Sequence, residues 1–223
     1  DLEIELKKIK LIFDPLKLSL NIKTVGSKIK KKNKVVEIEN IKTQISLKSI
    51  LSDEFFIKNL EISSKSLEIK NLISFLRTFQ NSTQLFLLEK IIDKGYLIAD
   101  IKIEFDSDGS INNNFIIDGF IKDVKLSILK EYNIQKLDLI FNYQKNDLLL
   151  SDISFSFNNL NFLSEKIFLT KINDDYTIKG NINHKALIID DQNLNILKKS
   201  ILSKLDVQRI ELSSNNSFFL KIN

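Results

Sequence analysis

Residues 16–23 read Leu-Lys-Leu-Ser-Leu-Asn-Ile-Lys, a strict alternation of apolar and polar side chains that decides the fold. Successive side chains of a β-strand point to opposite faces, so this segment has one apolar face and one polar face. The same rhythm returns over residues 101–105, 137–141 and 176–182. The alternation therefore predicts a mainly β protein whose sheet has an apolar face to cover.

Two changes of period predict short helices. Apolar residues fall at helical spacing over residues 72–79, after Asn71 as a helix cap, and over residues 85–92, after Ser82 or Thr83. We expect these two helices to pack on one end of the sheet. The second is apolar nearly all round, so a helix that seeks a membrane surface is the alternative.

The remaining elements follow from alternation bounded by turn residues. A third helix is expected over residues 193–205, after Asp190 or Asp191. Lysines crowd residues 28–34, which predicts a solvated hairpin tip, with contact to an anionic lipid surface as the alternative. We expect strands at residues 2–13, 16–25, 35–38, 41–47, 56–62, 67–69, 96–105, 115–121, 125–129, 134–143, 148–157, 160–172, 176–184, 207–212 and 218–222.

Composition narrows the class of protein. The chain has 223 residues, 43% hydrophobic and 28% charged, which is typical of a globular protein. Its net charge of +4 comes almost entirely from lysine, and Arg77 and Arg209 are its two arginines. Because specific nucleic-acid recognition favours the guanidinium fork, we expect no nucleic-acid partner. Zero cysteines exclude disulfides and zinc–thiolate sites.

The sequence shows no pattern typical of a membrane-spanning helix or of a targeting signal. No apolar window is long enough to predict a membrane-spanning helix, and Asp1 begins no signal-peptide pattern. We interpret residues 1–223 as a single section of a longer protein, with any anchor outside it. A subdivision into residues 1–94 and 95–223 is the alternative.

Catalytic constellations are missing from the sequence. His184 is the only histidine, and we interpret it as a partly buried strand residue. Asp106 and Asp108 beside Gly109 suggest a hairpin turn, because the later ligands of a calcium loop are missing. We therefore expect a protein that is not an enzyme and that needs no metal or cofactor.

The order of elements resembles the AsmA family, and the resemblance covers most of the chain. Residues 95–180 are similar to the long meanders of that family, and residues 36–69 look like its N-terminal region. Ser64, Lys65 and Ser66 stand where family members often carry a Gly-Pro pair. The residues that carry the resemblance are Val36, Ile38, Glu39, Asn40, Ile41, Ile45, Ser46, Leu47, Ile50, Leu51, Ile57, Leu60, Glu61, Ile62, Leu67, Glu68, Ile69, Leu137, Leu139, Phe141, Tyr143, Leu148, Leu150, Asp152, Ile153 and Phe157.

This resemblance implies a repeating β-groove: a long, curved, mostly antiparallel sheet, apolar inside and polar outside. It implies a bridge that moves phospholipid or another acyl lipid between the inner and outer membranes of a diderm bacterium. The expected location is the periplasm or the periplasmic face of the inner membrane, with membranes contacted through regions outside this chain. The groove-facing candidates are Leu18, Leu20, Ile22, Ile101, Ile103, Phe105, Leu137, Leu139, Phe141, Ile153, Phe155, Phe157, Ile178 and Ile182.

Two other functions produce the same alternation. A structural or assembly module of the cell envelope would bury its whole apolar face against itself, as a closed β-sandwich does. An adhesin-like domain would bind protein partners by strand addition at an exposed sheet edge. The open or covered state of the apolar face separates these alternatives from the groove.

Overall fold

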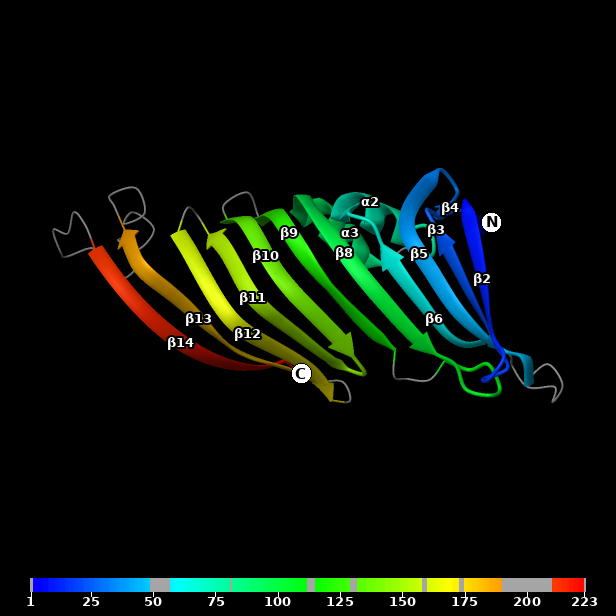
Figure 1. Cartoon of the computed structure of the whole chain (residues 1–223). Helices are drawn as coiled ribbons and strands as arrows, with labels where there is room; N and C mark the ends of the chain where they lie inside the picture. Colours follow the sequence, from blue (N-terminus) through cyan, green and yellow to red (C-terminus); the bar gives the residue numbers. More distant parts are fainter. Residues whose placement is uncertain are drawn as a thin grey trace.

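A computed structural model gives the architecture of the chain (Figure 1). It describes residues 2–48, 57–80, 82–111, 115–128, 132–157, 160–172, 175–189 and 210–222, with the backbone only at residues 185–189 and 210–212. The expected third helix, residues 193–205, lies outside the described residues.

The protein is one long, curved, unclosed antiparallel sheet of 14 strands with two short helices, and 75% of it is strand. The fold class predicted from sequence is confirmed. The strands are β1 (Leu2–Glu5), β2 (Lys8–Asp14), β3 (Ser19–Val25), β4 (Lys28–Lys31), β5 (Lys34–Ser46), β6 (Ile57–Ser64), β7 (Leu67–Glu68), β8 (Ile92–Glu104), β9 (Ile116–Ile128), β10 (Tyr132–Gln144), β11 (Asp147–Phe157), β12 (Leu160–Ile172), β13 (Asp175–Ile189) and β14 (Ile210–Ile222), and the helices are α2 (Ile69–Leu76) and α3 (Thr83–Ile91).

The sheet is a meander in which neighbours in the chain are neighbours in space. From β8 to β14 the strand order follows the sequence. At the other end, β1 and β2 pair with β4 and β3, and these two pair with successive halves of β5. Gly26, with a φ of 70°, makes the bend between β3 and β4. Local pairing of this kind explains why a repeated alternation suffices to specify so large a sheet.

Pairing along one side of β8 is interrupted between β6 and β7, at Ser64, Lys65 and Ser66. The buried Ser64 hydroxyl accepts a hydrogen bond from the Ala99 amide of β8 at 2.8 Å. This bond satisfies a backbone donor of β8 where the ladder to β6 stops. Beyond Ser66, β7 resumes pairing with the same strand.

A line of bulges crosses the middle of the sheet. Asp123 in β9, Lys136 in β10 and Asp152 in β11 have φ values of 53°, 52° and 50°, and the register shifts beside each of them. The Asp138 carboxylate accepts the Asp123 amide proton at 2.7 Å, which fixes the first bulge. Because a bulge bends its strand and increases its twist, aligned bulges curve the whole sheet.

We expect Lys136→Gly to raise the free energy of unfolding by about 0.5–1 kcal/mol, because glycine removes the left-handed strain of the bulge. The matched control is Lys102→Gly, at an exposed position of β8 outside the bulge line, which should lower it by about the same amount. Urea unfolding measures both changes. A loss of stability in both variants would contradict a strained bulge at Lys136.

Both helices pack against one face of the sheet. Ile69 and Ile73 of α2 join Ile92 and Val124 in one buried cluster. Phe75 of α2 joins Val36 and Ile38 of β5 in a second cluster. The expected packing of the helices at one end of the sheet is thus observed, and Figure 1 shows both helices at the upper ends of the strands.

The caps of the two helices differ from each other. The Ser82 hydroxyl accepts the Leu85 amide proton at 3.3 Å, so the expected cap of α3 is confirmed. Asn71 caps nothing, because α2 begins at Ile69 and the Asn71 amide instead donates to Glu68 at 2.6 Å. The helix starts earlier than expected because burial of Ile69 against the sheet favours the extra turn.

Several expected boundaries are wrong. The expected strand 2–13 is two strands, β1 and β2, whereas other pairs of expected strands are each a single strand. The expected strands 115–121 and 125–129 are one strand, β9, in which the polar residues 122–123 form a bulge and not a turn. Residues 207–212 and 218–222 likewise contain the ends of the single strand β14, which begins at Ile210. Polar residues inside a solvent-facing strand imitate turns, so alternation predicts too many short strands.

Candidate functional site

The register of the sheet assigns every strand residue to one of two faces. Directly opposed residues of antiparallel strands carry their side chains on the same face. One row of opposed residues crosses eleven strands, running from β2 through β3, β5 and β6 and then from β8 to β14, and it defines what we call the central row. The central row consists of Ile9, Thr24, Ile41, Ile62, Ile101, Ile117, Tyr143, Leu148, Leu169, Ile178 and Leu220.

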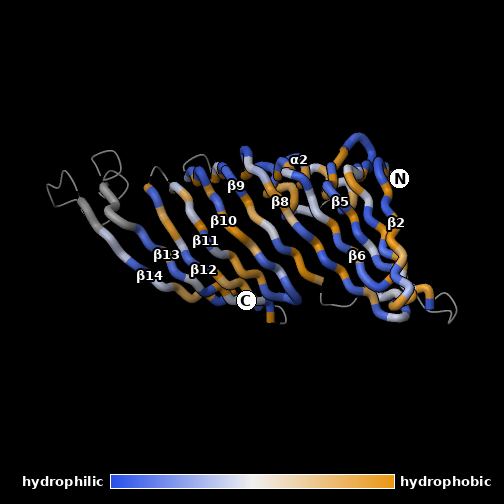
Figure 2. Tube along the Cα trace, viewed as in Figure 1, coloured by the Kyte–Doolittle hydropathy of each residue, from blue (hydrophilic) through white to orange (hydrophobic). Residues whose placement is uncertain are grey.

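The central row is almost entirely apolar from β2 to β14. Thr24 is its single residue without a large apolar side chain. We call the face that carries this row the apolar face. Figure 2 shows hydrophobic and hydrophilic residues alternating along the strands. The opposed row one position away, on the other face, is polar at seven of its eleven positions, so the two faces differ in chemistry. It consists of Lys8, Val25, Asn40, Ser63, Asp100, Asp118, Asn142, Leu149, Phe168, Lys179 and Phe219.

Thirteen of the fourteen groove-facing candidates lie on the apolar face. They lie at even spacing from central-row residues in the same strands, or on the same side after a bulge. The structure therefore brings these candidates together on one surface. They are Leu20, Ile22, Ile101, Ile103, Phe105, Leu137, Leu139, Phe141, Ile153, Phe155, Phe157, Ile178 and Ile182.

Leu18 is the exception, since it lies in a turn and has a φ of 45°. The Asp14 carboxylate accepts the amide protons of Leu16 and Lys17, each at 3.1 Å. This local bonding holds the chain in a turn after Pro15 and delays the strand until Ser19. The prediction that the strand starts at residue 16, with Leu18 in the groove, is wrong for this reason.

Aromatic rings line the C-terminal half of the apolar face. Phe155 and Phe162 stack with ring centroids 5.3 Å apart, and Phe162 stacks on His184 at 5.8 Å. His184 is 9% exposed and its Nδ1 lies 3.1 Å from the Ser214 hydroxyl. The interpretation of His184 as a partly buried strand residue is confirmed. Its imidazole places a polar group beside the aromatic rings at this end of the face.

Only part of the apolar face is covered. In the part of the chain that the structure describes, the elements packed on this face are α2 and α3, and they contact β5, β7, β8 and β9. At the edges the face is open: Leu11 of β2 is 63% exposed and Leu220 of β14 is 53% exposed. Apolar surface therefore extends beyond what the helices bury.

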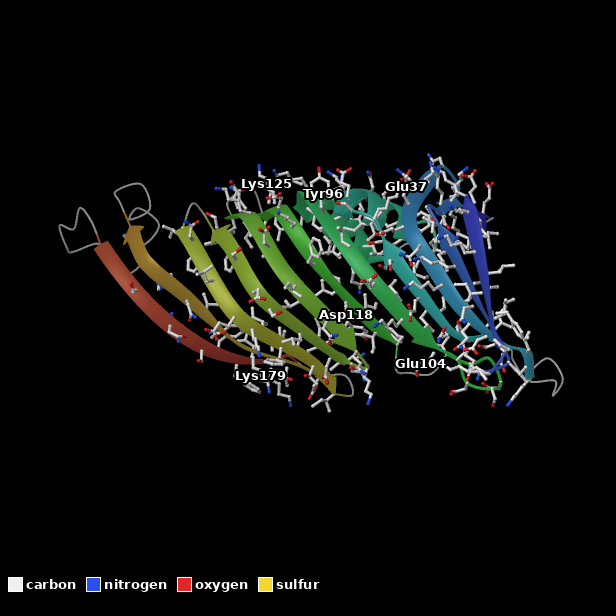
Figure 3. All side chains as sticks on the ribbon, viewed as in Figure 1. Glu37, Tyr96, Glu104, Asp118, Lys125 and Lys179 are labelled. Atoms are coloured by element: carbon white, nitrogen blue, oxygen red, sulfur yellow. The ribbon has the colours of Figure 1, made fainter. Side chains whose placement is uncertain are left out.

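The opposite face carries apolar residues that the sequence reading missed. Phe120 and Ile140 are directly opposed there and are 43% and 48% exposed. With Lys122 and Asp138 they line a shallow hollow of about 310 Å³. Adjacent apolar pairs such as Phe120 and Ile121 were the available signal, because one residue of each pair must face outward. Four residues labelled in Figure 3, Tyr96, Glu104, Asp118 and Lys179, lie on this opposite face by their register.

Ion pairs lie at the ends and outer sides of the strands. Hydrogen bonds from Lys65 at 2.8 Å and from Lys28 lower the pKa of the Glu37 carboxyl. A lowered acid pKa stabilises the fold at neutral pH, and this contribution is lost as the pH falls through that pKa. Glu5 and Lys30 form a second pair, between β1 and β4. These ion pairs join neighbouring strands away from the central row, which carries no charged residue.

The described residues contain neither a cluster of metal ligands nor a helix that could span a membrane. Among them, His, Asp and Glu side chains nowhere gather into a set able to hold a metal ion. Helices of the described segments are all too short or too polar to cross a bilayer.

Comparisons of the chain with protein-family models, curated proteins and solved structures give no match, so the resemblance to the AsmA family rests on the sequence pattern.

Proposed function

We propose that this protein is a non-enzymatic lipid-binding groove that carries or conducts phospholipid between the inner and outer membranes of a diderm bacterium. The observation that carries the proposal is the central row, which continues without a charged residue from β2 to β14. Lipid tails need contact with apolar atoms and no specific hydrogen bond. A surface of this kind can hold a tail at any point along its length.

The dimensions of the sheet suit this cargo. A strand of 13 residues, such as β8, is about 43 Å long at about 3.3 Å per residue. The hydrocarbon of one bilayer leaflet is about 15 Å thick, so the apolar face is larger than one acyl chain requires. Each methylene removed from water contributes about 0.8 kcal/mol, and this gain changes little as a tail slides along the row.

The resemblance to the AsmA family supports the transport part of this proposal and a location in the periplasm or at the periplasmic face of the inner membrane. The rival function is a cell-envelope scaffold whose apolar face is wholly self-buried. It requires a second layer over β10–β14, and the described residues contain none. The open edge positions Leu11 and Leu220 favour a groove that receives a ligand.

Native mass spectrometry of the purified chain tests the proposal. We expect phospholipid masses to accompany the protein, and delipidated protein to take up phospholipid again from vesicles. Fluorescent phospholipid transfer between donor and acceptor vesicles then tests conduction. A protein that stays free of lipid in both measurements would overturn the proposal and leave the scaffold as the better reading of the fold.

A further inference from the structure

Helix α3 is unusual because it buries none of its nine residues completely. Phe86, Leu87 and Leu88 follow one another along it and are 42%, 50% and 45% exposed. A short amphipathic helix normally turns its large apolar residues toward the protein. Consecutive residues of a helix are about 100° apart, so these three leave apolar surface uncovered on more than one side of α3.

The end of α2 extends this surface. Leu76 is 41% exposed and Phe79, just beyond the helix, is 49% exposed. Arg77 lies 5.3 Å from the Phe86 ring and pairs with Glu89, so it joins the two helices. We call Leu76, Phe79, Phe86, Leu87 and Leu88 together the helical patch.

The fold places the lysine run of residues 28–34 beside the helical patch. Lys31 Nζ lies 3.5 Å from the centroid of the Phe79 ring. The turn at Lys32 joins β4 to β5, and Lys34 lies directly opposite Lys31 in that hairpin. On the other side of the patch, Lys90 Nζ lies 5.7 Å from the Phe86 ring. Positive charge therefore flanks the apolar surface on two sides.

Carboxylates at this end of the sheet already have partners. Glu89 pairs with Arg77, and Glu37 pairs with Lys28 and Lys65. The Asp93 carboxylate accepts the Ser127 hydroxyl proton.

Two pairs of lysines at this end of the sheet lie directly opposite each other. Lys94 is directly opposite Lys125 in the β8–β9 ladder, as Lys34 is opposite Lys31. Figure 3 shows Lys125 at the upper edge, where Figure 1 places α2 and α3. These opposed pairs concentrate positive charge at the end of the sheet that carries the helices.

We propose that the helical patch and the lysines of the β4–β5 hairpin form a docking surface for an anionic lipid bilayer. Leucine and phenylalanine enter the boundary of headgroups and acyl chains, while lysines reach the lipid phosphates. Lysine suits this partner because a bilayer presents many mobile charges and no fixed fork for arginine. This surface is distinct from the apolar face, and it goes beyond the binding of lipid tails.

Flotation with vesicles of phosphatidylcholine, with and without phosphatidylglycerol, tests the docking surface. We expect binding only when phosphatidylglycerol is present, and loss of that binding at high salt. The triple variant Lys31→Gln, Lys32→Gln, Lys34→Gln should bind these vesicles about 100-fold more weakly. Each lysine alone is expected to contribute a factor of about ten or less to the affinity. Leu87→Ser tests the apolar part and should weaken binding about tenfold.

The matched control replaces three lysines of β2 and β3 at a distance from the patch: Lys8→Gln, Lys10→Gln, Lys23→Gln. It changes the net charge equally and should change vesicle binding less than about threefold, because nonspecific charge contributes weakly. Equal loss in the two triple variants, or equal binding to vesicles without phosphatidylglycerol, would overturn the docking surface.

Native mass spectrometry on the same variants separates this proposal from the proposed function. Variants of the docking surface should keep co-purified phospholipid, because the apolar face is unchanged. A protein that carries lipid but ignores anionic vesicles refutes the docking surface alone. A protein that binds the vesicles but carries no lipid refutes the groove alone. Thermal unfolding verifies that each variant is folded, and a small change is expected because Lys32 and Leu87 are exposed and Lys31 and Lys34 are half-buried at the surface.

Discussion

Replacing Gly119 with valine is expected to lower the free energy of unfolding by about 3 kcal/mol, the upper part of the range for overpacking a well-packed site. Gly119 lies on the apolar face between Ala99 and Phe141. A Cβ at this position would lie 2.7 Å from Phe141 Cζ and would also meet the Ile98 carbonyl oxygen. The Phe141 ring can move only by losing its packing across β9. The Ile98 carbonyl cannot move without disturbing the hydrogen bonds between β8 and β9.

Urea unfolding of three variants tests this expectation. Gly119→Ala should lower the free energy of unfolding by less than Gly119→Val, since alanine adds only the first offending atom. The control Ser217→Val places the same side chain at an exposed position of β14 and should change stability by about 0.5 kcal/mol or less. If Gly119→Val were as stable as the control, the close packing of Phe141 over β9 would be wrong.

The faces of the sheet could be predicted from sequence because alternation is a local property. Ile101 and Ile103 point the same way in any strand that contains both, whatever that strand pairs with. Thirteen of fourteen groove-facing candidates share a face for this reason, and the structure adds the register that joins them into one surface.

Positions where local turn chemistry or long-range packing competes with alternation could not be predicted in this way. Leu18 continues the pattern perfectly, yet the Asp14 carboxylate bonds to two following amides and keeps it in a turn. Asp123 looks like a turn residue, yet the Asp138 carboxylate of the next strand holds it in a bulge. The Asp14 bonds are local, and Asp14 followed by Pro15 was the available turn signal. The Asp138 bond could not be inferred without knowing the partner strand.

Sequence patterns offered membrane contact as an alternative for the lysine run and for the second helix separately, but they did not indicate that the two lie together. The lysine run and the apolar helix are separated by some 50 positions, and each has an ordinary explanation when taken singly. Their significance depends on the contact of Lys31 with Phe79, which only the packing of α2 beside β4 and β5 creates. Interaction surfaces assembled from distant segments are a general limit of pattern reading.

Ile178→Asp is expected to reduce phospholipid bound by the purified protein about 10- to 100-fold, because a carboxylate in an apolar lipid site loses its hydration. Ile178 belongs to the central row and is half-buried between Leu169 and Leu220. The matched control is Thr177→Asp. Thr177 is its neighbour in β13, half-buried and on the opposite face, so the same charge enters the same strand away from the proposed ligand.

The pH dependence of the two variants gives the sharpest separation between ligand contact and general damage. Burial against lipid tails raises the pKa of a carboxyl group, so the new Asp at position 178 becomes neutral as the pH falls toward that raised pKa. Phospholipid binding by Ile178→Asp should then recover on mild acidification. Binding by Thr177→Asp, measured by the same native mass spectrometry, should stay near that of the unchanged protein throughout. Equal losses in the two variants, with no recovery at lower pH, would mean that lipid does not distinguish the faces and that the central row is not its binding surface.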